Sequence, residues 1–270
     1  MVKIVADLSS NHMGDIALAK QMIKAAAAAG VDCIKVQSWQ ADKLSKNFKG
    51  DYQSTYQRHK KAELSDDDHY ELIDWCRKNN VEFLTTCFDL ERIEFLASLG
   101  LKFIKVASSD CTSKKLIKKL MDNFETIIVS TGMTTGDEIK NTIKLLSDHD
   151  YIMLHCVSLY PTPLGKCNLN RINWLRKQGA KRVGFSDHSI GTEAAMAVMT
   201  MGIELVEKHL SLDRTLSGKD QQMSTTPDEF AEICRWRDLC VQMLGEENAP
   251  LSEEELKLRE IYVGKWGDNR

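Results

Sequence analysis

The chain has 270 residues, of which 43% are hydrophobic and 28% are charged, and its formal net charge at pH 7 is -3. This balance excludes a disordered chain and is typical of a soluble globular protein with a large core. Lys and Arg total 36 against 39 Asp and Glu. Because no long basic cluster is present, we expect neither a nucleic-acid partner nor a membrane partner.

The apolar runs are far shorter than the ~20 residues that a membrane span needs, and no export signal precedes the first strand-like segment. The eight cysteines are scattered, without a Cys-x-x-Cys pair, at positions 33, 76, 87, 111, 156, 167, 234 and 240. Several lie in apolar runs, where cysteine packs as a small hydrophobic residue. We expect reduced thiols and a cytoplasmic protein.

Eight short runs rich in apolar and β-branched residues predict strands. In chain order they cover residues 3–8, 33–37, 82–86, 103–107, 126–130, 151–155, 182–186 and 205–209. Amphipathic stretches with helical periodicity follow them, at residues 16–29, 67–79, 90–99, 114–122, 137–147, 169–178, 192–201 and 228–243. Strand and helix therefore alternate eight times, and glycines such as Gly30 and Gly100 stand where helices should end.

This order predicts an α/β fold, a single-domain (β/α)₈ TIM barrel, because eight units of roughly 30 residues fill the ~250 residues usual for that fold. A doubly wound sheet would normally carry a glycine-rich dinucleotide loop after its first strand, and residues 9–14 do not form one. We assign residues 1–245 to the barrel and 246–270 to a charged tail, for which a short helix on the barrel is one option. The long connection 38–64 is expected to be a lid or substrate loop.

Polar side chains gather where the predicted strands end, which is where a TIM barrel places its active site. The hydroxyl of a single serine or threonine at a strand end is hydrogen-bonded to a neighbouring loop about as often as it belongs to a functional site. Only the whole set therefore indicates a site. In chain order the set includes Asp7, Lys35, Gln37, Thr86, Lys105, Ser108, Asp110, Ser130, His155, Tyr160, Ser186, His188, Lys208 and His209.

Two lysines are the sharpest anomaly in this set. Lys35 and Lys105 stand inside the apolar sequences Cys-Ile-Lys-Val-Gln and Phe-Ile-Lys-Val-Ala. Lysine is almost never buried in such a strand without an anion as its partner. Hydroxyl groups lie at neighbouring strand ends, on Thr86, Ser108, Ser130 and Ser186. Together these side chains predict a cradle for a phosphate or a phosphorylated carboxylate.

Two histidines and two aspartates complete the candidate site. His188 and His209 end the seventh and eighth strands, which are neighbours in a closed barrel, and two neutral imidazoles can hold a divalent metal with water in the open positions. Two isolated histidines are more often structural. Asp7 and Asp110 end the first and fourth strands and are the candidate acid or base. Asp110 can equally cap the turn that follows it.

These segments resemble the sialic acid (N-acetylneuraminate) synthase family, whose members condense phosphoenolpyruvate with an aldose to form a 3-deoxy-2-keto sugar acid. The likeness spans nearly the whole predicted barrel, in short segments that follow one another in the same order. They lie at residues 10–15, 34–37, 83–89, 104–108, 129–133, 154–163, 184–188 and 207–210. Eight such matches in order make the resemblance highly specific.

The resemblance implies three subsites. His188 and His209 would hold a manganese or magnesium ion (Mn²⁺ or Mg²⁺) that polarises the open-chain aldehyde of the sugar. C3 of the enol would then attack the aldehyde carbon, and water would add at C2 before phosphate leaves. Gln37, Tyr160 and Asp220 fall where the family contacts the sugar. Phosphoenolpyruvate would be bound by six residues, namely Lys35, Thr86, Lys105, Ser108, Ser130 and Ser186.

Two features depart from the family pattern. Asp7 and Asp110 stand where the family typically has glutamate, a retraction of ~1.5 Å, and misplacement on that scale can cost about a hundredfold in rate. The chain also stops soon after the eighth predicted helix, without the antifreeze-like domain that family members usually carry and that reaches the sugar site of the other subunit. Part of the sugar pocket would then be missing. Either the loops 38–64 and 211–226 close it, or a separate chain does, or the aldose is not N-acetylmannosamine.

The sequence thus predicts a transferase that joins phosphoenolpyruvate to a sugar aldehyde, N-acetylmannosamine or another aldose, for sialic or related nonulosonic acid synthesis. A homodimer is left open. One alternative is a pyruvate aldolase that forms a Schiff base at Lys35 or Lys105. The other is a catalytically reduced barrel that acts as a binding or regulatory subunit, which the shortened carboxylates favour and the retained lysines and histidines oppose.

Overall fold

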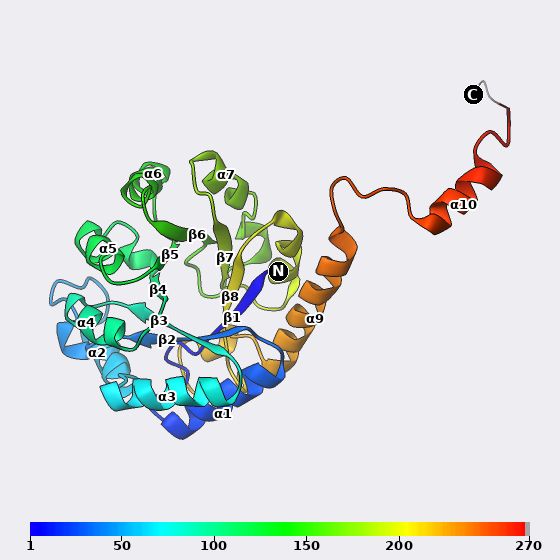
Figure 1. Ribbon diagram of the computed structural model, residues 1–270. Coiled ribbons are helices and arrows are strands. Elements are labelled where there is room, and N and C mark those ends of the chain that lie inside the picture. The colour runs from blue at the N-terminus through cyan, green and yellow to red at the C-terminus, as the bar shows by residue number, and fades with distance from the viewer. Residues whose placement is uncertain (268–270) are drawn as a thin grey trace.

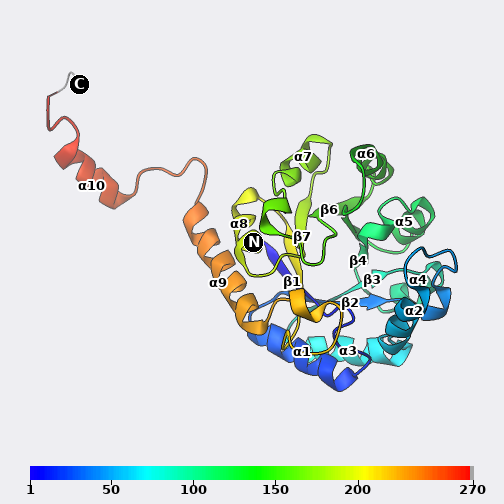
Figure 2. The same ribbon diagram turned by 180° about the vertical axis from the view of Figure 1, so that it is seen from behind.

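A computed structural model describes residues 1–267 and shows eight parallel strands closed into a barrel with helices around it (Figures 1 and 2). Each strand pairs with the next, and β8 closes the barrel on β1, with Lys3 opposite Leu205 and Asp7 opposite His209. The predicted TIM barrel is confirmed. The strands are β1 (Lys3–Asp7), β2 (Cys33–Ser38), β3 (Glu82–Cys87), β4 (Phe103–Val106), β5 (Thr126–Ser130), β6 (Asp150–Cys156), β7 (Val183–Asp187) and β8 (Leu205–His209).

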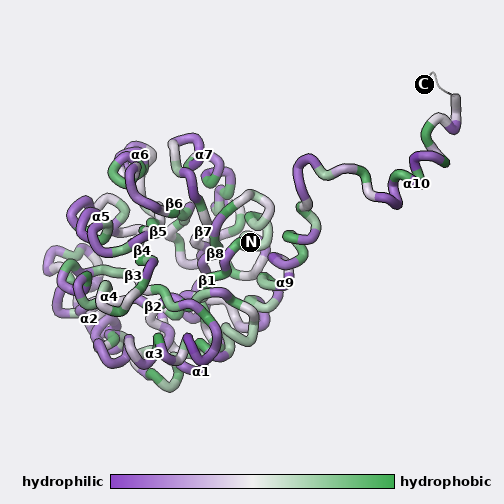
Figure 3. The backbone as a smooth tube through the Cα atoms, viewed as in Figure 1, coloured by the Kyte–Doolittle hydropathy of each residue, from purple (hydrophilic) through white to green (hydrophobic). Residues whose placement is uncertain are grey.

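The helices lie outside the strands, and Figure 3 shows hydrophobic and hydrophilic residues alternating along them, as expected where one face is buried. Capping boxes at Ser65, Thr135 and Thr226 begin three of them, α3, α6 and α9. The helices around the barrel are α1 (Ile16–Ala28), α3 (Asp66–Lys78), α4 (Ile93–Ser98), α5 (Lys114–Met121), α6 (Gly136–Leu145), α7 (Arg171–Lys177), α8 (Glu193–Ala197) and α9 (Pro227–Leu244).

Two of the predicted helices are shorter than expected. The stretch 90–99 begins as a 3₁₀ turn, Leu90–Arg92, before α4, and the stretch 192–201 ends in another, Met199–Met201, after α8. The chain also forms a helix within the long connection after β2, α2 (Tyr52–Lys61), which no apolar period in the sequence predicted. None of the residues of α2 is fully buried.

Strand alternation creates two hydrophobic layers. Outward-facing residues such as Ile34, Val129 and Phe185 pack against the helices. Inward-facing residues fill the lower barrel, namely Val5, Cys33, Leu84, Ile128, Ile152, Leu154 and Leu205. Because this inner layer closes the barrel from below, a ligand can enter only at the carboxyl ends of the strands. The eight cysteines are free and buried.

The same alternation separates Lys208 from its neighbours on β8. Its ammonium faces the helices, where it forms a buried ion pair with Asp187 at 2.7 Å and donates to the carbonyl of Ser189 at 2.8 Å. Lys208 is therefore a structural residue rather than a part of the barrel mouth. The residues on either side of it, Glu207 and His209, face the interior.

After α9 the chain leaves the barrel, and α10 (Glu253–Tyr262) stands away from it (Figures 1 and 2). All residues of α10 are exposed, so this helix does not lie on the barrel. Within the described residues, no helix combines the length and the hydropathy that crossing a membrane requires.

Candidate active site

The carboxyl ends of the strands open into a cavity of about 260 Å³. Of the residues that the sequence assigned to the catalytic, phosphoenolpyruvate, sugar and metal sites, only Asp110 does not line this cavity, and the others come from all eight strands or the loops that follow them. Two further polar residues noted at strand ends, His155 and Lys208, do not line it. The predicted residues that the structure brings together are Asp7, Lys35, Gln37, Thr86, Lys105, Ser108, Ser130, Tyr160, Ser186, His188, His209 and Asp220.

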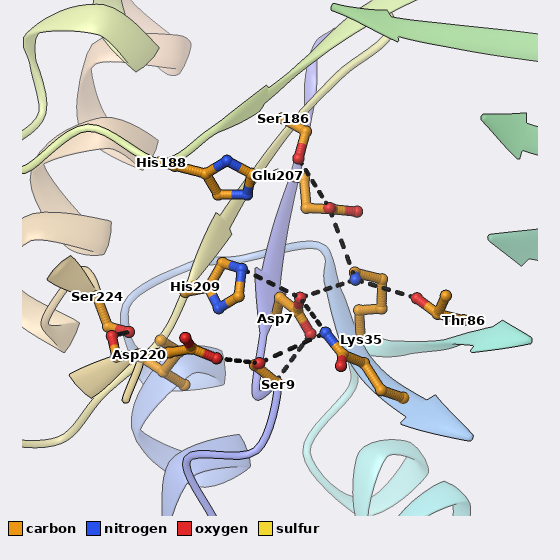
Figure 4. A network of polar contacts seen from close by, with 12 residues as sticks. Asp7, Ser9, Lys35, Thr86, Ser186, His188, Glu207, His209, Asp220 and Ser224 are labelled. Atoms are coloured by element: carbon orange, nitrogen blue, oxygen red, sulfur yellow. Dashed lines mark hydrogen bonds and ion pairs between the residues drawn. The ribbon is translucent and has the colours of Figure 1, made fainter. Parts of the chain in front are cut away.

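Lys35 lies at the centre of a buried polar network, shown in Figure 4. Its ammonium donates to Asp7 Oδ2 at 2.8 Å and to Thr86 Oγ1 at 3.2 Å, and lies 3.6 Å from Glu207 Oε1. Burial lowers the pKa of Lys35, but Asp7 and Glu207 outweigh it, so that the pKa is raised. The anion that a buried lysine requires is thus already supplied to Lys35 by the protein.

Asp7 is held as a carboxylate by four neighbours. Besides Lys35, it accepts hydrogen bonds from the backbone N–H of Ser9 at 2.9 Å and from Gln37 Nε2 at 3.2 Å, and His209 Nε2 lies 3.8 Å away. Burial raises the pKa of Asp7, but Lys35 and then His209 oppose this effect and lower the pKa to about 2. Asp7 is therefore ionised at neutral pH and serves as an acceptor.

Lys105 differs from Lys35 because it forms no ion pair with any residue between 1 and 267. Its ammonium donates to Ser130 Oγ at 2.6 Å and to the carbonyl of Val106 at 3.0 Å. Burial lowers the pKa of Lys105, and this effect exceeds the opposing influence of Glu207. Since an ammonium group has three N–H donors, Lys105 retains one for a ligand.

Glu207 is a site residue that the sequence interpretation missed. It is 5% exposed and accepts a hydrogen bond from Ser186 Oγ at 3.1 Å. Burial raises the pKa of Glu207, but Lys105 and Lys35 outweigh it and lower the pKa. Its Oε2 is buried without a partner among the described residues. The available signal was a glutamate inside the apolar run Leu-Val-Glu-Lys-His, an anomaly of the same kind as the two lysines.

The rings of His188 and His209 meet edge to face at the mouth, with centroids 5.4 Å apart. Nδ1 of His188 lies 2.9 Å from the carbonyl of Val157, so this nitrogen carries a proton and Nε2 is the nitrogen available to a metal ion. Burial lowers the pKa of His209, which favours the neutral ring, and its Nδ1 is buried without a partner among the described residues. Both imidazoles can therefore act as metal ligands.

The donor set at the mouth is compatible with a metal ion that takes further ligands from elsewhere. No group of three or more His, Cys, Asp or Glu side chains within the part of the chain that the structure describes is arranged to hold an ion. His188 and His209 alone would leave positions for water and substrate oxygens. Because Mg²⁺ prefers oxygen ligands, this pair of nitrogens suits Mg²⁺ less well than a divalent transition-metal ion.

Comparison with known proteins agrees with this geometry. The sequence model of the NeuB family matches residues 22–249. An N,N'-diacetyllegionaminic acid synthase of Campylobacter jejuni is 36% identical over 246 residues, which are 86% of this chain and 74% of that protein. The chain belongs to the NeuB family.

Two further relatives place this NeuB-family chain among sialic acid synthases and confirm the resemblance inferred from the sequence. An N-acetylneuraminate-9-phosphate synthase of Drosophila melanogaster is 32% identical over 245 residues, covering 86% of this chain and 66% of that protein. The crystal structure of a sialic acid synthetase from Leptospira borgpetersenii with citrate superimposes with a TM-score of 0.88 at 30% identity, covering 98% of this chain and 93% of that one. The predicted enzyme class, a transferase of the sialic acid synthase kind, is thus confirmed.

Asp110 is the one predicted catalytic residue that this NeuB-family structure does not bring to the cavity. It lies in the 3₁₀ turn Ser108–Asp110, where its carboxylate accepts hydrogen bonds from Ser109 Oγ at 2.7 Å and Ser113 Oγ at 3.0 Å. The carboxylate thus stabilises the turn before α5, which is the structural role that the sequence left open. Ser108 lines the cavity and accepts from the backbone N–H of Gly132 at 3.1 Å.

Cys156, at the end of β6, also lines the cavity and was not singled out from the sequence. Its Sγ lies 3.7 Å from Nδ1 of His188. Burial raises the pKa of this thiol, but the His188 ring outweighs it, so that the pKa of Cys156 is lowered. Burial lowers the pKa of His188, but Cys156 outweighs this effect, so that the pKa of His188 is raised.

Both long loops contribute to the NeuB-family cavity. The connection after β2 supplies Trp39, Arg58 and His59, and the loop after β8 supplies Lys219 and Asp220. Asp220 Oδ2 accepts a hydrogen bond from the hydroxyl of Ser9 at 2.8 Å, which connects the second loop to the segment that follows β1. Tyr160 packs on His188 with ring centroids 4.1 Å apart. The mouth is thus built from aromatic and charged side chains.

Proposed function

We propose that this chain condenses phosphoenolpyruvate with a sugar aldehyde to give a 3-deoxy-2-keto sugar acid of the nonulosonic type. The observation that carries the proposal is Lys105, a fully buried ammonium with no carboxylate at ion-pair distance among the described residues. A phosphate or carboxylate of the substrate supplies the anion that such a group needs. The proposal follows the chemistry of the NeuB family.

The phosphoenolpyruvate subsite that we propose consists of two lysines with unequal tasks and the hydroxyl groups around them. Lys105 has no carboxylate within ion-pair distance among the described residues and would pair with the ligand, whereas Lys35 is bound by Asp7 and Glu207 and mainly orients the ligand. The hydroxyl groups lie on neighbouring strand ends and can donate to phosphate oxygens. They belong to Thr86, Ser108, Ser130 and Ser186.

The sugar lies nearer the mouth in this proposal, where Gln37, Tyr160 and Asp220 line the cavity. His188 and His209 would hold the divalent ion, which when bound supplies positive charge to the aldehyde oxygen. Tyr160 packs on His188 at a tilt and limits where the sugar can approach that ring. The aldehyde carbon then lies between the histidines and the deeper phosphoenolpyruvate subsite.

Asp7 and Glu207 are the candidates for handling the water that adds at C2. Lysine neighbours keep both groups ionised, so each can accept a hydrogen bond from that water and orient it. Oε2 of Glu207 is the oxygen without a protein partner among the described residues. Asp110 has no part in this step, because its carboxylate is bound in its own turn.

The direct test is phosphate release from phosphoenolpyruvate with a panel of aldoses, with and without Mn²⁺. We expect release only when an aldose and the metal are both present. Trapping with pyruvate and borohydride distinguishes the Schiff-base aldolase, since a covalent adduct at a lysine would contradict the synthase mechanism. Binding of phosphoenolpyruvate without turnover of any aldose would instead favour the catalytically reduced barrel.

The metal assignment makes a separate prediction. His188→Ala and His209→Ala should each weaken Mn²⁺ binding at least about a hundredfold, because each removes one of only two protein ligands. The loss is measured by the electron paramagnetic resonance signal of free Mn²⁺, which does not depend on turnover. His149→Ala is the control, since His149 lies before β6 at the opposite end of the barrel. Equal Mn²⁺ binding by all three variants would exclude the histidine pair.

A further inference from the structure

Lys208, the buried residue beside His209, also contacts the segment that carries His188. The rings of both histidines point into the polar network of the cavity (Figure 4). Lys208 directly precedes His209 in the chain, and its ion-pair partner Asp187 directly precedes His188. The side chains of Lys208 and Asp187 are each 1% exposed, and neither residue lines the cavity. This ion pair can therefore influence the site only through the backbone.

The ammonium of Lys208 holds the chain on both sides of His188. It lies 2.7 Å from Asp187 Oδ2, and it donates to the carbonyl of Ser189 at 2.8 Å. Asp187 Oδ1 in turn accepts from the backbone N–H of Ser189 at 2.8 Å. The three contacts close a ring of hydrogen bonds, and His188 is the residue between the two neighbours that the ring anchors. We call Asp187 and Lys208 the clamp.

The clamp acts where the pairing of the two strands ends. Asp187 opposite Lys208 is the last pair in the register between β7 and β8, so His188 lies beyond that pairing. The carbonyl and the Nδ1 of His188 contact the loop after β6 instead, at Thr162 and Val157. The clamp is therefore a direct hydrogen-bonded link between the segment of His188 and the strand of His209.

A metal site with only two protein ligands depends strongly on how those two ligands are placed. Functional groups generally have to be held within about 0.5 Å of their productive positions by residues that are themselves locked in place. The clamp meets this requirement, because both of its members are buried and each contact in the ring is at hydrogen-bond distance.

We propose that Asp187 and Lys208 are positioning residues, which fix the placement of the His188 and His209 rings relative to each other and so set the affinity of the mouth for a divalent ion. The inference rests on the proposed function, in which these two histidines hold the metal. Groups that orient metal ligands from behind typically contribute about tenfold to a hundredfold to metal affinity. Here the orientation passes through the backbone around His188 and through the peptide bond between Lys208 and His209.

The test is a double variant, Asp187→Asn with Lys208→Met, in the full chain. Lys208→Met alone would leave the Asp187 carboxylate buried without its cation and destabilise the fold. The double variant removes both charges and retains an amide oxygen for the N–H of Ser189, but it loses the contact to the Ser189 carbonyl. We expect its Kd for Mn²⁺, measured by the electron paramagnetic resonance signal of the free ion, to rise about tenfold to a hundredfold.

Two further variants complete the comparison. Asp187→Glu keeps both charges and displaces the contact with Lys208, so the Kd for Mn²⁺ should rise even if the double variant does not fold. Arg237→Met is the control, because it breaks the ion pair of 2.6 Å with Asp32, which precedes β2 at the opposite end of the barrel. It should lower the urea midpoint and leave the Kd for Mn²⁺ unchanged within about twofold.

A second readout needs no metal. In protein labelled with ¹⁵N-histidine, the ring signals of His188 and His209 are assigned through their alanine variants. We expect both signals to shift in the clamp variants and to stay unchanged in Arg237→Met. The signal of His149, which lies before β6 at the opposite end of the barrel, should stay unchanged in all of them.

The outcomes separate the clamp from the condensation. An unmodified Kd for Mn²⁺ or unshifted ring signals in the folded clamp variants would overturn the clamp, even if phosphate is released. An equal loss of Mn²⁺ affinity in Arg237→Met would overturn it as well, because general destabilisation would then explain the loss. Loss of affinity confined to the clamp variants supports the clamp. If the unmodified protein then releases no phosphate from phosphoenolpyruvate with any aldose, the clamp stands and the condensation is overturned.

Discussion

Lys105→Met should weaken the binding of phosphoenolpyruvate and leave the barrel folded. Lys105 is buried and forms no ion pair with a described residue, and burial lowers its pKa, so its ammonium gains little from the protein itself. Methionine has a similar shape and no charge to desolvate. Loss of a charged hydrogen bond to the ligand should weaken affinity by about tenfold to a hundredfold. Calorimetry measures the affinity and urea unfolding measures the stability.

Lys35→Met is the matched variant, and it should behave in the opposite way. Removing Lys35 leaves Asp7 and Glu207 buried without the cation that lies 2.8 Å and 3.6 Å from them. Breaking a buried ion pair from one side costs about 3–5 kcal/mol of unfolding free energy. We therefore expect a clear drop in the urea midpoint. A stable Lys35→Met protein or an unchanged affinity in Lys105→Met would contradict this division of tasks.

Asp7→Glu should lower turnover about a hundredfold, even though the sialic acid synthase family typically has glutamate there. The carboxylate of Asp7 is 1% exposed and accepts from Lys35, Ser9 and Gln37 in its present position. An additional methylene would move it by ~1.5 Å and disturb these contacts, and catalytic groups are sensitive to displacements of that size. The measurement is kcat with the preferred aldose and saturating phosphoenolpyruvate.

Asp110→Glu is the control for that change, because it adds the same methylene at a carboxylate outside the cavity. Its partners are Ser109 and Ser113 in the turn before α5, so we expect turnover within about threefold of the unmodified protein. A many-fold gain in turnover in Asp7→Glu with N-acetylmannosamine would mean that the aspartate marks loss of function rather than adaptation to another aldose. A large loss in Asp110→Glu would give this residue a catalytic part.

The strands could be predicted closely because burial on both faces leaves continuous apolar runs that turns interrupt. The helix α2 could not, since its residues Tyr52–Lys61 have no apolar face and its position depends on contacts from Trp39 and Gly14, far away in the sequence. The helix predicted at 90–99 was too long at its start, because Leu90–Arg92 form a 3₁₀ turn before α4 begins.

The candidate site could be predicted where a residue type was incompatible with its surroundings. Lys35 and Lys105 were found in this way, and Glu207 could have been found by the same reasoning had strand alternation been applied to the last strand. Alternation also separates Lys208 from His209, which the sequence alone grouped together. The internal partner of Lys35 could not be predicted, since pairing with Asp7 depends on the register between β1 and β2.

Strand β8 also limits how this gene can change. Its three last residues serve opposite sides of the barrel wall, with Glu207 and His209 facing the cavity and Lys208 bound to Asp187 beneath the helices. Inserting or deleting one codon in this strand would reverse which side chains face the cavity and which face the helices. The ammonium of Lys208 would then lie in the cavity, and Glu207 and His209 would lie among the apolar helices. The strand can therefore diverge only by substitution, whereas α10, which touches no strand, can change length freely.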